Sequence, residues 1–308
     1  MGLRIATVRN QLAMNTTAAG EQSDDIRFGF NAHALHLDIY AQKDEATAAT
    51  WQNFLDKVTR VKIITANGTP EVSVASDDLH SFNVLAMGFS PYHSINTSTA
   101  DIPHALALGY GLSPFPEDPL KNFGMPAGQG IQFIQEQSAD VNQDFDTFIY
   151  DLTVDGVDSG DKPSSGGYVR MVEDAYTSGA VGEIRKTDIG PAKRILGVEN
   201  FQTTSYEDLA ASAANDVTGI RTQSLAFSDQ IQFSYRPLRS GAFKWNMTVA
   251  SFAAAAAEIG ILSNDFFYSD FGIRNQGGVL GVAYQANAKI QTTAGVAEAT
   301  RVVPVALV

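Results

Sequence analysis

The sequence predicts an all-β protein made of two sandwich-like domains with a few short helices. Runs rich in Val, Ile, Thr, Phe and Tyr recur along the chain and are separated by turns rich in Gly and Pro. The segment DGVDSGDKPSSGG at 155–167 has the composition of a linker, and the strand pattern restarts after it. At 308 residues, the chain has the length of two domains that can each bury a core.

The strand pattern places the first domain at residues 1–156, a linker at 157–167 and the second domain at 168–308. Outside the hairpin discussed next, strands of the first domain are expected at 3–8, 28–30, 34–41, 104–110, 131–135 and 145–154. Those of the second are expected at 168–172, 183–189, 194–198, 226–235, 243–249, 278–290 and 301–308. Short helices are expected at 206–214 and in the Ala-rich stretch 250–258.

One module of the first domain is well defined by its sequence. Residues from Val58 form a β-rich run, Asn67-Gly68 suits a two-residue hairpin turn, and the strand that starts near Val72 returns from it. Ser76 then caps a short helix whose first turn carries Asp77 and Asp78, at the end of the helix dipole that favours negative charge. These elements form a structural module and contain no catalytic motif.

The module resembles the first barrel of the double jelly-roll major capsid proteins, in the adenovirus-like lineage of tailless, internal-membrane-containing icosahedral phages. The resemblance covers about thirty residues, and the matching ones are Val58, Thr59, Arg60, Val61, Asn67, Gly68, Asp78, Leu79 and Asn83. The rest of the chain agrees in its length and in its succession of short strands.

The resemblance implies two jelly rolls side by side, with three copies forming a pseudo-hexagonal capsomer of an icosahedral shell. It also implies minor capsid and vertex proteins as partners, a membrane beneath the shell, and the virion as the protein's location. The Pro-rich loop 113–127 and the junction 155–167 are the candidates for exposed or intersubunit loops.

Charge and composition restrict the function. The net charge of −13 disfavours nucleic-acid binding, which depends on Lys and Arg, and Arg4 and Arg9 are interpreted as scattered surface charges. Charged residues make up 18% of the chain, below the roughly 25% usual in soluble proteins, as suits a subunit whose surface is partly covered by neighbours. The first fifteen residues do not resemble a signal peptide, so synthesis in the host cytoplasm is expected.

The sequence shows no organised catalytic centre, and no catalytic, cofactor-binding or metal-binding residue is predicted. Cysteine is absent, and His33 and His36 would point to opposite faces of one strand. Asp38 and Glu258 have apolar neighbours but no evident carboxylate partner. The Gly-rich segments 124–130 and 275–282 lack the lysine of a phosphate-binding loop and are expected to form turns and barrel corners.

One acidic cluster leaves two alternatives open. Asp140, Asn142 and Asp144 have the spacing of a calcium-binding loop, and Asp151 falls at its twelfth position. However, Phe145 occupies the position where such a loop needs Gly. A polar turn before a strand is therefore favoured over a site for an adventitious cation.

A second function class shares the strand pattern and the low charge. A two-domain β-sandwich that binds or hydrolyses carbohydrate would show clustered aromatic residues or a convergent pair of carboxylates. Trp51 and Trp245 are far apart in the sequence, so the structural interpretation, without enzymatic activity, is preferred.

Overall fold

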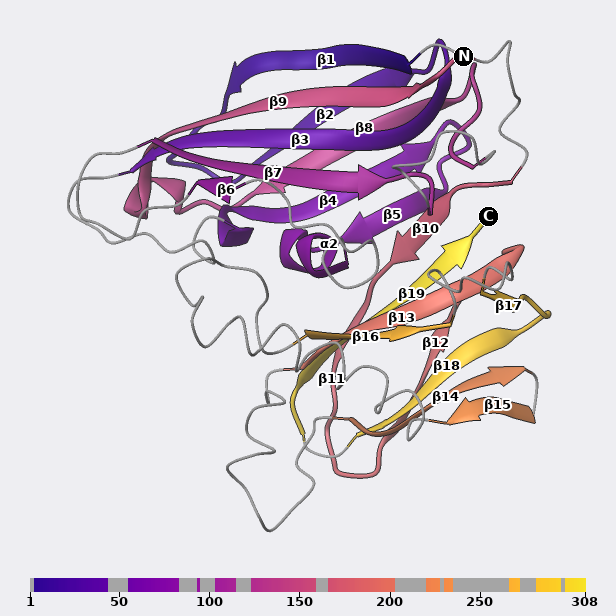
Figure 1. Ribbon diagram of the computed structural model, residues 1–308. Coiled ribbons are helices and arrows are strands. Elements are labelled where there is room, and N and C mark those ends of the chain that lie inside the picture. Colours follow the sequence, from indigo (N-terminus) through magenta and orange to yellow (C-terminus); the bar gives the residue numbers. More distant parts are fainter. Residues whose placement is uncertain are drawn as a thin grey trace. The chain divides into compact units, whose positions relative to one another are not determined.

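The computed structural model describes residues 3–43, 55–82, 93–94, 103–114, 123–158, 166–202, 220–227, 230–234, 266–271, 281–294 and 297–308 (Figure 1). The chain forms two compact units. The first contains the described residues up to Val169, and the second contains those from Arg170 onward; the boundary falls within strand β10 (Val169–Val172), which is described with the second unit.

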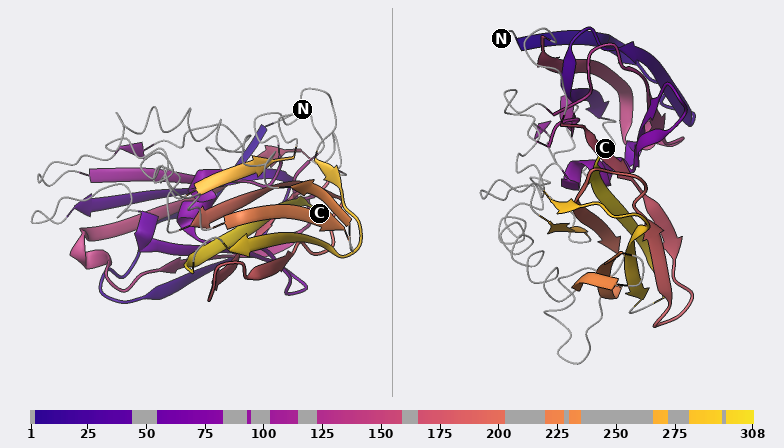
Figure 2. Two further views of the ribbon diagram at one scale, coloured as in Figure 1. Left: turned by 90° about the horizontal axis from the view of Figure 1, so that it is seen from below. Right: turned by 90° about the vertical axis from the view of Figure 1, so that its right-hand side faces the viewer.

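The first unit contains two antiparallel sheets. Its elements are β1 (Leu3–Ala13), β2 (Gly20–Arg27), β3 (Asn31–Lys43), β4 (Val58–Thr65), β5 (Pro70–Val74), α2 (Ser76–Phe82), β6 (His93–Ser94), β7 (Pro103–Gly111), β8 (Gly130–Gln137), η2 (Val141–Gln143) and β9 (Phe145–Val157). One sheet has the order β1-β9-β3-β7-β6, and the other contains β5-β4-β8-β2. The strands of the first unit can be followed by their indigo to magenta colours in the right-hand view of Figure 2.

This strand order is that of a jelly roll. If β1, β2, β3, β4, β5, β7, β8 and β9 are lettered B to I in chain order, the sheets read B-I-D-G and C-H-E-F. Each sheet therefore alternates strands from distant parts of the sequence, as two interlocked Greek keys require. The topology depends on long-range pairings such as that between β1 and β9.

The second unit has the same topology. Its elements are β10 (Val169–Val172), β11 (Asp174–Thr177), β12 (Ile184–Asp188), β13 (Arg194–Gln202), β14 (Ile220–Phe227), β15 (Gln230–Ser234), β16 (Phe266–Asp270), β17 (Val282–Ala283), β18 (Ala288–Ala294) and β19 (Ala299–Leu307). The order β11-β19-β13-β16 corresponds to B-I-D-G, and β12-β18-β14-β15 corresponds to C-H-E-F. The predicted all-β double jelly roll is thereby confirmed.

Alternation of side chains produces the core of the first unit. On β9, Phe148, Tyr150 and Leu152 are buried, while the intervening residues face outward. Strand β3 alternates in the same way, with Leu37 and Ile39 buried. In α2, Leu79 and Phe82 are buried as well. Burial of such side chains stabilises the fold by about 1.5–3 kcal/mol each.

The core of the second unit is mainly aliphatic. One cluster joins residues from both of its sheets and consists of Ile189, Ile195, Val198, Leu225, Ala288, Ile290, Val302 and Ala306. The burial pattern of β18, in which every second residue is buried, contributes Ala288 and Ile290 to this cluster.

Both jelly rolls contain the same glycine corner before strand H. Gly124 and Gly281 have φ angles of +113° and +62°, and a Cβ at either would collide with a backbone carbonyl, that of Ala32 or Ile195. In each case this carbonyl belongs to the second residue of strand D. Only glycine fits such a position without strain, so Gly124 and Gly281 are corner residues; residues 275–280 of the second Gly-rich segment lie outside the described residues.

Several sequence predictions need correction. The sequence does not predict strand β2, because it is a polar edge strand and an edge strand needs little apolar sequence. The strand predicted at 28–30 is wrong, since these residues form the connection after β2. Residues 226–235 and 278–290 each contain more than one strand. The predicted elements at 206–214, 243–249 and 250–258 lie outside the described residues, as does Trp245.

The hairpin module is confirmed, with two local differences. Its loop spans residues 66–69, and only Gly68 has a positive φ, so the turn is longer than the predicted two-residue type. Ser76 is the first residue of α2 rather than the residue before it, and its hydroxyl donates to the carbonyl of Leu55 at 2.7 Å.

The ends of the two candidate loops also differ from expectation. Residues 112–114 and 124–125 are buried, so the loop 113–127 is anchored at both ends. Residues 155–157 belong to β9, so the polar segment proposed as a junction begins later than its composition suggests.

Candidate functional site

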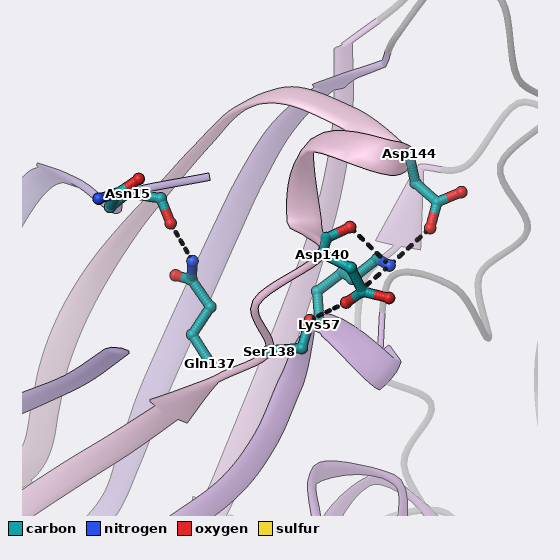
Figure 3. Close-up of polar contacts among 6 residues, drawn as sticks. All are labelled: Asn15, Lys57, Gln137, Ser138, Asp140 and Asp144. Atoms are coloured by element: carbon teal, nitrogen blue, oxygen red, sulfur yellow. Dashed lines mark hydrogen bonds and ion pairs between the residues drawn. The ribbon is translucent and has the colours of Figure 1, made fainter. Parts of the chain in front are cut away.

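The acidic segment before β9 is organised around a lysine. Asp140 and Asp144 flank the short helix η2, and the Lys57 ammonium lies between them (Figure 3). The Lys57 Nζ donates to the Asp140 carbonyl at 3.1 Å and forms an ion pair with Asp144 Oδ2 at 2.8 Å. The Lys57 side chain is only 7% exposed. A buried charge of this kind is tolerated because it is paired and hydrogen-bonded.

This lysine decides between the alternatives for the cluster. The ammonium occupies the position that a cation would take between Asp140 and Asp144. Asp151 instead lies on the outward face of β9, where its carboxylate accepts a hydrogen bond from the Gln11 backbone N–H. Asn142 is exposed, and its backbone N–H donates to the Thr16 carbonyl at 2.9 Å. The segment is the polar turn favoured by the sequence.

Nearby polar contacts complete this end of the first jelly roll. Ser138 donates to Asp140 Oδ1 at 2.6 Å, and this hydrogen bond lowers the pKa of the Asp140 carboxyl. The Gln137 amide donates to the Asn15 carbonyl, tying β8 to the β1–β2 connection (Figure 3). Within the described part of the chain, no group of three or more His, Asp or Glu side chains could hold a metal ion.

The histidines of β3 do not form a site. His33 is buried, whereas His36 lies on the outward face and contacts Asp155 through Nε2···Oδ2 at 3.1 Å. The hydrogen bond to Asp155 raises the pKa of His36. The two rings lie in different environments, as the spacing predicted.

Asp38 has a carboxylate partner that the sequence did not reveal. The register places Asp38 directly opposite Asp151 on the outward face of β3 and β9. Burial raises the pKa of Asp38, and the charge of Asp151 adds to this shift, while His36 opposes it. No carboxylate partner of Asp38 is evident in the sequence, because only strand register brings these two residues together. Glu258 lies outside the described residues.

A buried acid links the two sheets of the first jelly roll. Asp24 on β2 is 1% exposed, pairs with Arg9 on β1, and accepts a hydrogen bond from the Tyr150 hydroxyl at 3.3 Å. Burial raises the pKa of Tyr150. Arg9 is therefore a structural residue, contrary to its interpretation as scattered charge, whereas Arg4 forms an exposed pair with Asp158.

The first jelly roll also has an open groove of about 500 Å³. Its lining comes from β2, the end of β4, the hairpin loop and β8, and consists of Asp25, Ile26, Arg27, Ile64, Thr65, Ala66, Gly68, Gly130, Ile131 and Gln132. The charged lining residues are Asp25 and Arg27, and the lining contains no histidine. The lining therefore contains no pair of carboxylates and no histidine–carboxylate pair.

Comparisons with solved structures identify the fold. The chain is similar to the major capsid protein of STIV, the Sulfolobus turreted icosahedral virus, with TM-score 0.66 and 11% identity over 100% of this chain and 97% of that one. The major capsid protein P2 of bacteriophage PM2 gives TM-score 0.56 and 8% identity over 100% and 98% of the two chains. The PBCV-1 virus capsid model gives 0.60 and 9% over 99% and 93%.

These structural similarities define the fold class of the chain. Neither a family model nor a curated protein matches the sequence. The fold of the chain is that of the double jelly-roll major capsid proteins of viruses, so the resemblance seen in the hairpin module is confirmed for the fold. In the described residues, no helix has the length and apolar character needed to cross a membrane.

Proposed function

We propose that this chain is a viral major capsid protein that forms homotrimeric, pseudo-hexagonal capsomers of an icosahedral shell. The proposal rests on one observation. Both jelly rolls have the same strand order, and capsid proteins of known structure share this fold over nearly their full length. Three copies of a two-barrel chain present six similar wall elements around a threefold axis. One gene product can then tile a surface with nearly hexagonal units.

The proposed function is structural rather than enzymatic. The clustered polar groups of the first jelly roll are used in internal contacts, as in the ion pair of Lys57 with Asp144 and that of Arg9 with Asp24. The groove lining has one carboxylate, Asp25, with no histidine and no second carboxylate beside it. The protein acts in the virion after synthesis in the host cytoplasm, without specific nucleic-acid binding.

The proposal includes the domain limits and the other partners. The first jelly roll occupies residues 1–156 and the second 168–308, joined by the linker 157–167. Strand β9 ends at Val157, within one residue of the first limit, and strand β10 begins at Val169, within one residue of the second. Minor capsid and vertex proteins contact the capsomers, and an internal viral membrane lies beneath the shell.

Electron microscopy of the purified, full chain tests this function. Threefold particles with a six-sided outline, or closed shells built from them, are expected. A preparation that contains only dispersed single chains over a wide range of concentration and salt would contradict the proposal. Reproducible hydrolysis of glycans that one Asp or Glu substitution abolishes would favour the carbohydrate-active alternative.

A further inference from the structure

Strand β1 is an exposed edge. None of its eleven residues is buried, and Leu3 and Ile5 are 68% and 69% exposed. These are the most exposed large apolar side chains in the described part of the chain. Strand β1 ends the sheet order β1-β9-β3-β7-β6, so within the described residues its outer backbone groups have no paired strand. Such an edge favours pairing with another strand.

The free part of this edge is short and regular. Leu3 to Thr7 pair with β9 without interruption, whereas register shifts follow between Thr7 and Arg9 and between Arg9 and Leu12. Bulges of this kind disturb the ladder and protect an edge against further pairing. The regular segment Leu3–Thr7 has no such protection.

Local charge also permits a second copy to approach here. A net charge of −13 makes copies of this chain repel one another. Beside Leu3–Thr7, however, Asp158 is paired with Arg4, and Asp155 is paired with His36. The carboxylates next to this edge are therefore largely compensated.

We propose that Leu3–Thr7 pairs antiparallel with the same segment of a second copy, with the two Ile5 residues opposite each other. This register places Leu3 opposite Thr7 of the second copy and Arg4 opposite Ala6. The arginines do not face each other, and one apolar row crosses both copies on the outward face. This inference rests on the proposed function.

Symmetry determines where such a contact acts. A strand that pairs with its own copy requires a twofold axis, which a trimer lacks. The contact therefore joins two trimers. Five paired residues bury much less than the roughly 1,200 Å² of a stable interface, so the contact is weak alone and contributes within a shell where it is repeated.

Strand β12 is a second exposed edge, but it is less suited to pairing with its own copy. Strand β12 ends its sheet and carries Ile184, which is 56% exposed, with exposed Val181 shortly before it. Lys186 is the central residue of β12, so antiparallel pairing of this strand with itself would place two lysines opposite each other. A contact between β1 and β12 of different copies is the competing arrangement.

Single-cysteine variants test the proposal, because the natural chain has no cysteine. Ile5→Cys is expected to form disulfide-linked dimers under mild oxidation of assembled protein, with at least tenfold higher yield than the matched exposed variant Ile184→Cys. Leu3→Cys mixed with Thr7→Cys should cross-link more than either variant alone. Ile5 is exposed, so circular dichroism should show an unchanged fold.

The outcomes separate this inference from the capsid assignment. If trimers and shells form but Ile5→Cys gives no more dimer than Ile184→Cys, the pairing of β1 edges is wrong and the capsid function stands. Preferential cross-linking of Ile5→Cys to Ile184→Cys would establish the competing arrangement and also overturn the proposal. If the full chain forms no assembly, both proposals fail.

Discussion

The two jelly rolls have the same strand order but are stabilised by different residues. Six of the seven largest fully buried side chains in the described residues belong to the first, and Tyr268 belongs to the second. Strands β3 and β9 have 13 residues each, whereas the longest described strands of the second unit have nine. The comparison teaches that this topology depends on alternating burial and on turns rather than on particular core residues.

Matched core truncations give the largest expected effects. Phe148→Ala and Ile290→Ala each remove a side chain that is 1% exposed, at a cost of about 3–5 and 2–5 kcal/mol respectively. If the jelly rolls unfold separately, each variant lowers the stability of its own unit. Hydrogen exchange measured by mass spectrometry locates the effect. Equal loss of protection in both units would show that they unfold as one.

Lys57 gives the first jelly roll a buried ion pair with Asp144. Lys57→Met leaves the Asp144 carboxylate buried without its ion pair, which typically costs about 3–5 kcal/mol. Lys62→Met is the control, because Lys62 and Glu136 are each 28% exposed and such a pair contributes at most about 1 kcal/mol. Urea unfolding measures both. Similar midpoints for the two variants would refute a structural role for Lys57.

The shared glycine corner predicts equivalent effects in the two units. Gly124→Ala and Gly281→Ala each impose a positive φ on alanine and a collision with strand D, and the backbone strain alone costs about 1–3 kcal/mol. Gly128→Ala also has a positive φ but has open space around the new methyl group, so its cost should be lower. Thermal unfolding measures the loss of stability in the three variants. A larger loss for Gly128→Ala than for the other two would contradict this explanation.

The smallest effect concerns pH and the outward face of the first jelly roll. Asp155 raises the pKa of His36 in the folded protein. The stabilisation of the fold by this ion pair is therefore fully present below the ordinary histidine pKa and is lost as pH rises through the folded pKa. Asp38 and Asp151 lie on the same face. His36→Gln should therefore reduce stability at pH 5.5, by less than about 1 kcal/mol because the pair is exposed, and have no effect at pH 9. Asp155→Asn should give the same profile, and a loss that persists at pH 9 would exclude the ion pair as its cause.

The sequence predicted the fold better than the polar contacts, for a physical reason. Apolar alternation and glycine turns are local signals, so β9, the hairpin module and the glycine corners could be found. The pairing of Asp38 with Asp151 depends on register between strands more than a hundred residues apart. Lys57 reaches Asp140 and Asp144 across more than 80 residues, so no spacing rule could identify it as the partner of that cluster.

The central claim is that the full chain assembles through threefold capsomers. Light scattering coupled to size-exclusion chromatography measures the mass of the soluble species directly. The account predicts a species with three times the mass of the chain, together with larger assemblies at higher concentration. A strictly monomeric protein at every concentration, with no trimer in any particle, would contradict it.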